Sequence, residues 1–325
     1  MQNRRSGRLL NVTPDRKRTV VSLLLLLIFL AIMCIVQPSI VKFSRLATIT
    51  NAQMCLLLGG IGQTLVLLVG GIDLSIGGVI CLSNSLAALY MPESLPGMLA
   101  MCIGIIILGA AIGAFNGFVI TWFQVQPFVV TFTVNYVLLG IALKLLPIDG
   151  GEPPQTYVSA LLHKFGPVSV SMLLVIMILA GWVFFRRTRL IRNLYAVGGS
   201  PKASALNGID VVKVKIMTFA ISGGLAALAG LWRTAQLASG SPNAGDALTM
   251  PTITIAVIGG TSMAGGIGGI VGTVVGAYIL RLISDLLTFM GAKSFWSTVF
   301  QGVFLVVTVG ICSVVDMKKG GRLHG

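Results

Sequence analysis

One carboxylate and several glycines interrupt the apolar sequence near residue 73. The run Gly70–Gly78 reads Gly-Gly-Ile-Asp-Leu-Ser-Ile-Gly-Gly and separates the apolar stretches 54–69 and 79–89. Charged side chains and irregular backbone are costly at membrane depth, so they occur where protein buries them, where they line a cavity or where a span ends. The run is therefore the first candidate for a hinge or for part of a translocation path. Its candidate residues are Gly70, Gly71, Asp73 and Ser75.

Asp73 has two open interpretations. As a structural group, its carboxylate accepts hydrogen bonds from the N–H groups that open the next helix, with Ser75 assisting. As a gate or substrate residue, it contacts solute directly. The charge pattern described below places it near the cytoplasmic ends of the flanking spans, which favours the structural role.

Only a few other polar side chains lie within or beside apolar stretches. Neutral amides suit hydrogen bonding to an uncharged, hydroxyl-rich solute, and they equally suit contacts between helices. Both interpretations stay open for each of them. The further candidates for the path or hinge are Asn84, Asn116, Asn135, Thr261 and Ser262.

Several kinds of chemistry lack the residues they need. There is no Gly-x-x-x-x-Gly-Lys-Ser/Thr phosphate loop, and the two histidines, His163 and His324, lie in a loop and in the tail. We therefore expect no enzyme, no metal and no cofactor. Proton-coupled carriers usually need several buried acids, and only Asp73 qualifies. A self-sufficient carrier that uses Asp73 as its proton site is a weaker alternative.

The composition predicts a polytopic, all-α membrane protein. Of 325 residues, 55% are hydrophobic and only 10% are charged, whereas a soluble domain carries about 25% charged residues. A spanning helix needs about 20 apolar residues, and about ten helices fit, some of them broken or short. The predicted spans are 20–36, 54–69, 76–90, 98–121, 128–146, 168–185, 214–235, 249–260, 266–284 and 295–314.

The distribution of positive charge predicts the topology. Most of the 23 Lys and Arg residues lie in three segments: before the first span, in one middle loop, and at the C-terminus. The positive-inside rule places all three in the cytoplasm, so both termini are expected there. The same distribution explains the basic charge by a membrane location with lipid as a partner, without nucleic acid. The predicted domains are a basic tail (1–19), a transmembrane domain (20–316) with a cytoplasmic loop (186–213), and a second tail (317–325).

Two predicted spans look too short to cross a membrane. Residues 54–69 cover only about 24 Å as a helix, and 249–260 cover less, against a hydrocarbon core of about 30 Å. Short segments in each half of a chain predict broken helices around a transport route. Small residues four apart, such as Gly109, Gly113 and Gly117, predict close helix packing, either within the chain or in a dimer.

The loop segment Tyr195–Ile209 has its own pattern. A Gly-Gly turn is followed by small residues of helical character and then by an Asn-Gly stop. It is either an ordinary basic loop or a short helix that docks against a soluble subunit.

Four motifs in order resemble those of the permease subunits of bacterial ABC sugar importers of the ribose, xylose, galactose and autoinducer type. The resemblance covers about positions 50 to 316. The motifs are GGIDLSIGG at 70–78, Gly113–Gly117 followed by PFVVT at 127–131, YAVGGSPKASALNGI at 195–209, and IGGTSMAGG at 258–266.

The resemblance implies a function and a set of partners. It implies a multi-pass inner-membrane permease that works with a second permease chain, identical or paralogous. It also implies an ABC ATPase subunit, which hydrolyses ATP, and a periplasmic or extracellular solute-binding protein. The solute would be a monosaccharide or a similar neutral polyhydroxy compound; a nucleoside-type importer is the nearest alternative. By this analogy the ATPase-coupling residues are Tyr195, Gly198, Gly199, Ser200, Ala203, Asn207 and Gly208.

Overall fold

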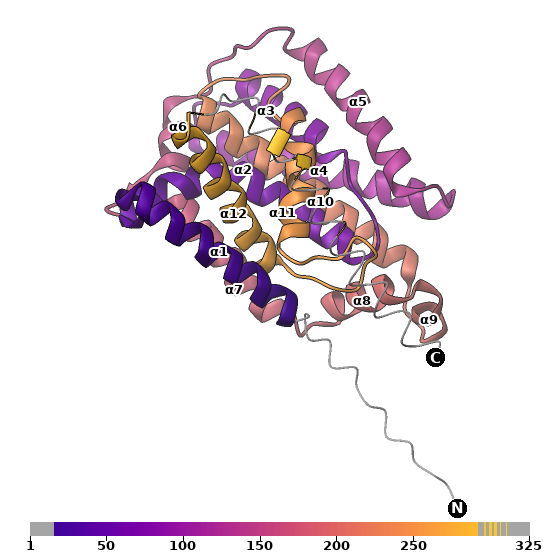
Figure 1. The fold of residues 1–325 in the computed structure, drawn as a ribbon. Helices are drawn as coiled ribbons and strands as arrows, with labels where there is room; N and C mark the ends of the chain where they lie inside the picture. Colours follow the sequence, from indigo (N-terminus) through magenta and orange to yellow (C-terminus); the bar gives the residue numbers. More distant parts are fainter. Residues whose placement is uncertain are drawn as a thin grey trace, which may run out of the picture.

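The computed structural model describes residues 16–291 and, beyond them, positions 296, 299, 300, 302, 303, 306 and 310 (Figure 1). The predicted tenth span (295–314) falls mostly outside the described residues. The C-terminal tail (317–325) and most of the N-terminal tail (1–19) also lie outside them.

The described chain is mainly helical, as predicted. Its helices are α1 (Arg16–Val36), η1 (Pro38–Val41), α2 (Phe43–Leu68), α3 (Ile76–Tyr90), α4 (Leu95–Trp122), α5 (Pro127–Leu145), α6 (Gln155–Leu162), α7 (Val170–Phe185), α8 (Arg189–Gly199), α9 (Pro201–Leu206), α10 (Val211–Leu237), η2 (Asp246–Leu248), α11 (Thr249–Ile258) and α12 (Ile270–Phe289). One small hairpin joins β1 (Lys164–Phe165) to β2 (Val168–Ser169) in antiparallel register.

Helices α2 and α10 form the centre of the bundle. Helix α10 packs against α4, α2 and α3, and α11 and α12 pack against α2. Helix α2 is buried along most of its length. Figure 1 shows α5 on one flank, where it contacts α3 and α4, and α1 beside α12 on the other flank.

Small residues bring the central backbones close together. A Cβ placed on Gly113 of α4 would collide with the carbonyl oxygen of Phe219 in α10, and one on Gly109 would collide with Gly223. Without a hydrophobic drive between helices in lipid, such close approach supplies the packing energy. The small-residue spacing is therefore used for packing within the chain.

The prediction that 54–69 is a short span is wrong. Helix α2 begins at Phe43, so the polar residues before 54 belong to it. They are tolerated because neighbouring helices pair with them: Trp232 Nε1 donates to Asn51 Oδ1 at 3.0 Å, and the hydroxyls of Thr50 and Tyr278 lie 2.6 Å apart. Low hydropathy left these polar side chains outside the predicted span, whereas tertiary partners satisfy them inside the helix.

The second short segment is confirmed. Helix α11 spans ten residues and is separated from α12 by the non-helical segment 259–269. Among the described residues, five helices are long and apolar enough to cross a membrane: α2, α4, α5, α10 and α12. Helix α7 makes a sixth if it is joined to α8, from which it is bent by 80°, and α3, α11 and residues 20–36 of α1 are shorter apolar helices. The chain is an all-α membrane protein, and the count of ten spans stays a prediction.

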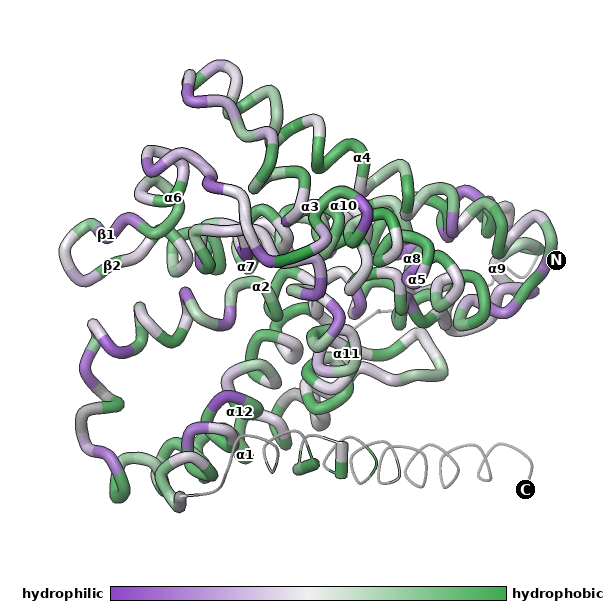
Figure 2. The backbone as a smooth tube through the Cα atoms, turned by 90° about the horizontal axis from the view of Figure 1, so that it is seen from above, coloured by the Kyte–Doolittle hydropathy of each residue, from purple (hydrophilic) through white to green (hydrophobic). Residues whose placement is uncertain are grey.

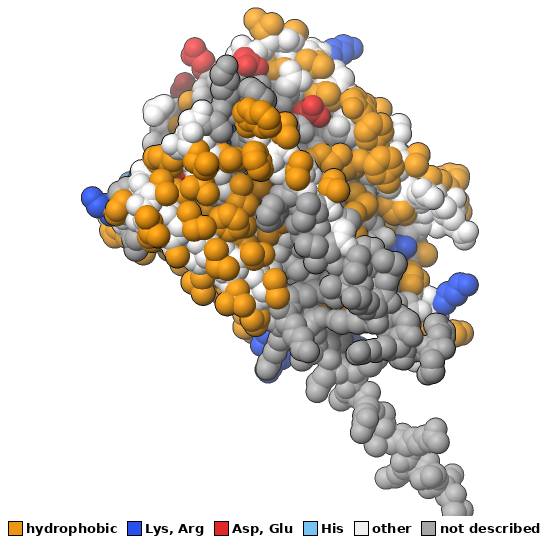
Figure 3. All heavy atoms as spheres, in the orientation of Figure 1, with side chains coloured by type: hydrophobic (Ala, Val, Ile, Leu, Met, Phe, Trp, Pro, Cys, Tyr) orange, Lys and Arg blue, Asp and Glu red, His pale blue; other side chains and the backbone are white. Residues whose placement is uncertain are grey.

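Apolar residues lie mainly along the helices of the bundle, and polar and charged residues lie mainly at its ends. Figure 2 shows apolar residues along the long helices and polar residues mainly in the connections. In Figure 3 the acidic side chains in view gather at the end that carries α6, whereas the basic ones in view are spread, with several toward the end near α8 and α9. The gathering of acidic side chains at one end agrees with the positive-inside pattern, and the orientation of the termini stays a prediction.

Candidate functional site

The Asp73 carboxylate is completely buried and accepts hydrogen bonds on both oxygens. Ser75 donates its backbone N–H (3.0 Å) and its hydroxyl (2.6 Å) to Oδ1, and the hydroxyl of Ser222 in α10 donates to Oδ2 at 2.8 Å. Three donors thus replace the water that a carboxylate loses on burial. The contacts tie the connection between α2 and α3 to the central helix α10.

A buried amide extends this network to α4. Asn116 Nδ2 donates to the Ser75 hydroxyl at 2.8 Å, and that hydroxyl in turn donates to Asp73. The three groups form a continuous chain of hydrogen bonds from α4 to the carboxylate. Such chains polarise one another and favour one arrangement of the helices.

Helix α5 contributes further polar contacts to the connection between α2 and α3 and to the first turn of α3. Asn135 Oδ1 accepts the backbone N–H of Gly78, in the first turn of α3, at 2.6 Å. Thr131 Oγ1 accepts the N–H of Leu74 at 3.0 Å. The cap on the first turn of α3 therefore comes from Asn135, whereas Asp73 binds the N–H of Ser75 just before the helix begins. Sequence reasoning used Thr131 only as part of a motif and missed its role here.

Three sequence motifs meet beside this network. The backbone N–H of Gly266, between α11 and α12, donates to the Leu68 carbonyl at the end of α2 at 3.0 Å. Gly198, at the end of α8, lies against the same carbonyl, because a Cβ there would collide with it. Gly70 (φ 73°) turns the chain out of α2 beside Ala264 and Gly265. We call these contacts of Leu68, Gly70, Gly198, Gly265 and Gly266 the glycine junction.

Comparisons with known proteins identify the family. A family model described as "Branched-chain amino acid transport system / permease component" matches residues 45–309. The chain is 34% identical over 307 residues to the ribose import permease protein RbsC of Escherichia coli (strain K12), with 92% of this chain and 93% of that protein covered. The chain belongs to the sugar ABC importer permease family. Its members are transport subunits and not enzymes.

Further relatives of the permease agree with this assignment. The D-allose transport system permease protein AlsC of the same strain is 31% identical over 262 residues, with 79% of each chain covered. The galactose/methyl galactoside import permease protein MglC is 27% identical over 314 residues, with 90% of this chain and 94% of that protein covered. No solved structure gives a significant match.

The predicted coupling segment of the permease folds as two helices, α8 and α9. The Tyr195 hydroxyl on α8 donates to the carbonyl of Gly268 at 2.6 Å, so α8 is bonded to the connection between α11 and α12. Ser200 Oγ accepts the N–H of Ala203 at 3.3 Å and caps α9. Asn207 and Gly208 (φ 78°) end it, as the Asn-Gly pattern predicts.

The outer side of α9 is exposed. Leu206 is 90% exposed, and Lys202 and Ala203 are exposed beside it. Single exposed apolar side chains are normal on protein surfaces, so Leu206 alone does not identify a docking surface. Helix α8 thus contacts the bundle, and α9 leaves a surface free within the described part of the chain.

Two of the predicted path residues have other surroundings. Asn84 donates to Thr234 Oγ1 at 2.9 Å and accepts the N–H of Ser241 at 2.6 Å, so it holds α3 against α10 and the segment after it. This is the helix-contact role that sequence left open. Ser262 Oγ accepts the N–H of Ala264 at 3.3 Å within the connection between α11 and α12.

Several buried polar atoms of the permease have no hydrogen-bond partner among the described residues. Both side-chain polar atoms of Gln63, in the middle of α2, are unpaired although the residue is fully buried. Leaving such a group unpaired costs about 1–3 kcal/mol, so it needs a physical reason. Other buried side-chain atoms without a described partner include Asn116 Oδ1, Thr249 Oγ1 and Thr261 Oγ1.

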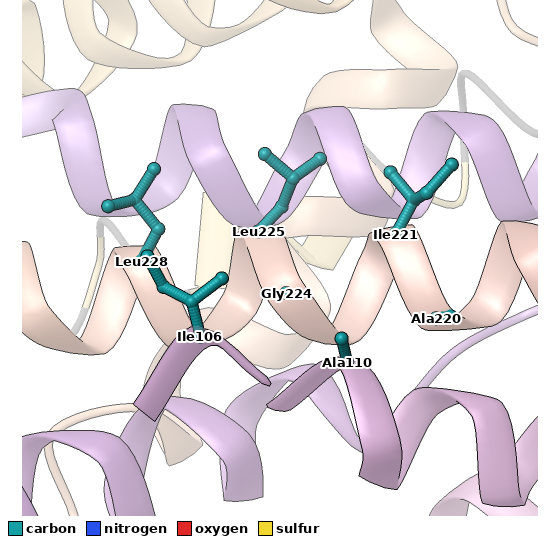
Figure 4. Close-up of a pocket in the computed structure, with 7 residues that line it drawn as sticks. All are labelled: Ile106, Ala110, Ala220, Ile221, Gly224, Leu225 and Leu228. Atoms are coloured by element: carbon teal, nitrogen blue, oxygen red, sulfur yellow. The ribbon is translucent and has the colours of Figure 1, made fainter. Parts of the chain in front are cut away.

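A separate apolar groove lies between α4 and α10. It has a volume of about 360 Å³, and Figure 4 shows the residues that line it, among them Ile106 and Ala110 on α4 and Ile221, Leu225 and Leu228 on α10. Its lining side chains carry no polar group that could bind a hydroxyl-rich solute. We therefore assign this groove to the apolar surroundings of the bundle and not to the path. In the described chain, no group of three His, Cys, Asp or Glu residues could hold a metal ion.

Proposed function

We propose that this chain is the transmembrane permease subunit of an ATP-driven importer for a monosaccharide or a similar neutral polyhydroxy solute. It would work in a bacterial inner membrane with a separate ABC ATPase, a second permease chain and a solute-binding protein outside. Its relatives in the family are named for the import of ribose, allose and galactose, which supports this solute class.

The glycine junction is the observation that carries the mechanism. It places α8, which leads to the exposed helix α9, in direct contact with the breaks after α2 and after α11. A force on α9 would reach both breaks without an intervening side chain, because the contacts are between backbones. Closely packed interfaces of this kind respond to a displacement by switching between two distinct packing arrangements, and they do not deform gradually.

The network around Asp73 supplies the other half of the proposal. It joins the break after α2 to α4, α5 and α10 through hydrogen bonds of 2.8 to 3.0 Å. A displacement of that break would therefore move several helices together. In this role Asp73 is a fixed hinge group, and direct contact with solute is the less favoured role.

The solute path would use the unpaired buried amide and hydroxyl groups. Gln63 and Thr249 offer neutral donors and acceptors that suit the hydroxyl groups of a sugar. Neither side chain is charged. In the packing described here these groups are closed off from solvent. We propose that they become accessible when the helices separate.

Reconstitution tests the function. The chain, reconstituted with its cognate ATPase and binding protein, should hydrolyse ATP faster when the solute and binding protein are present. Ribose, allose and galactose are the first solutes to try. If no solute stimulates the ATPase activity of the assembled complex, or if uptake proceeds without ATP on a proton gradient, the proposal is wrong.

A further inference from the structure

A hollow at the end of α7 combines an apolar wall with two arginines. It has a volume of about 680 Å³ and is lined by Ala180, Val183, Phe184, Arg186 and Arg187. The apolar residues lie in the last two turns of an apolar helix, and the arginines follow directly. The hollow therefore lies at the level where a membrane helix passes from hydrocarbon to headgroups.

The apolar wall is open to its surroundings. Val183 is 53% exposed and Phe184 is 75% exposed. In a membrane protein such side chains face lipid tails and not water. A ligand that fits this wall must have an apolar part, which a free anion does not have.

The two arginines have no acidic partner in the part of the chain that the structure describes. Neither makes an ion pair within the described chain, and the sequence contains no Asp or Glu between Glu152 and Asp210. Asp210 is engaged at the start of α10, where its Oδ1 accepts the N–H of Lys213 at 2.9 Å. Among the described residues, no acidic side chain therefore compensates the positive charge at the hollow.

We propose that this hollow binds an anionic phospholipid. Arg186 and Arg187 bind the phosphate of the headgroup, because a guanidinium group matches phosphate oxygens with paired hydrogen bonds. One acyl chain lies along Ala180, Val183 and Phe184. Basic pockets beside membrane helices bind anionic headgroups in this way, and the bound lipid would fix the bend between α7 and α8.

Native mass spectrometry of the full-length protein in detergent tests the proposal, with phosphatidylglycerol and phosphatidylcholine as the probes. We expect phosphatidylglycerol to bind more tightly. The double variant Arg186→Gln/Arg187→Gln should weaken phosphatidylglycerol binding by about tenfold or more. The matched variant Lys202→Gln/Lys213→Gln removes the same charge from exposed positions nearby and should change binding much less.

A second variant tests the contribution of the apolar wall independently of the contribution of the two arginines. Ala180→Trp fills the hollow without changing charge and should also weaken phosphatidylglycerol binding. Equal binding of the two lipids, or equal loss in the two double variants, would show general attraction and overturn the proposal. So would competition by millimolar inorganic phosphate, which indicates a free-anion site. Unchanged lipid binding with loss of the ATPase subunit in Arg186→Gln/Arg187→Gln would assign the arginines to subunit docking instead.

Discussion

At the scale of single residues, Asp73 is a buried acid whose partners are hydroxyls and a backbone N–H. Because none of these partners is a cation, its hydrogen bonds alone compensate its burial. An asparagine can keep both bonds from Ser75 on its oxygen and donate its own N–H to the Ser222 hydroxyl, which turns to accept it. A leucine can keep none of them. The pair of substitutions thus separates hydrogen bonding from charge.

We expect Asp73→Leu to lower the free energy of unfolding by several kcal/mol, since each unpaired buried donor costs about 1–3 kcal/mol. Asp73→Asn should melt close to the wild type and still transport. Thermal melting in detergent and uptake in vesicles measure the two effects. Asp149→Leu, at an exposed position, is the control. A folded Asp73→Asn protein without transport would instead show that the charge or a solute contact is required.

Gln63 presents the opposite case, a buried amide that no described residue satisfies. Gln63→Leu removes two unpaired polar atoms from the core, so stability should rise by about 1–3 kcal/mol. If the amide serves the path, transport should fall in the same variant. Melting and uptake are measured together, with the exposed residue Gln155→Leu as the control. A variant that is more stable and fully active would remove Gln63 from the path.

At the scale of elements, the end of α8 contains a matched pair of glycines. A Cβ on Gly198 meets the Leu68 carbonyl, whereas nothing lies within 4 Å of a Cβ on Gly199. Both are Gly-to-Ala changes in the last turn of α8, so the difference between them reports mainly the contact.

Gly198→Ala should therefore push α8 away from α2 and lower the free energy of unfolding by about 1–3 kcal/mol, the range for overpacking a close contact. Gly199→Ala should be neutral or slightly stabilising. Solute-stimulated ATPase activity of the reconstituted complex and thermal melting check this. Equal behaviour of the two alanine variants would contradict a role for the glycine junction in coupling.

Helix α9 should carry the contact with the ATPase. Ala203→Arg adds a long charged side chain to its exposed surface, so the ATPase subunit should no longer co-purify while the melting temperature stays unchanged. The control is Phe165→Arg, at the exposed hairpin far along the chain from α9. Retention of the ATPase subunit in the Ala203→Arg complex would place its docking surface elsewhere.

At the scale of the whole molecule, the contact between α4 and α10 holds the bundle together. Gly113 lies against the backbone of Phe219, whereas Gly104, on the same helix, has nothing within 4 Å of an added Cβ. Gly113→Leu should therefore prevent correct packing and reduce the yield of folded protein sharply, while Gly104→Leu should be tolerated in lipid. Fluorescence-detected size exclusion distinguishes the two outcomes, and a monodisperse Gly113→Leu protein would contradict this packing.

Much of the fold could be predicted from the sequence because it follows from local composition. Apolar runs are long enough to locate the helices, small residues four apart indicate close packing, and Asn207-Gly208 ends α9 where the pattern predicts. The length of α2 could not be predicted in this way. Its polar first turns are helical because Trp232 and Tyr278 pair with them, and those partners lie more than 180 residues away.

The sequence by itself determined the membrane class, the family motifs and the candidate status of Asp73, because a buried acid and glycine-rich breaks are unusual at any depth in lipid. Only the tertiary structure decided what these residues contact. It showed that Asn135 caps α3, that Asn84 joins helices, and that three motifs far apart in sequence meet at the glycine junction. The physical reason is that hydrogen-bond partners and backbone contacts depend on which helices pack together, and spacing along one chain does not specify that.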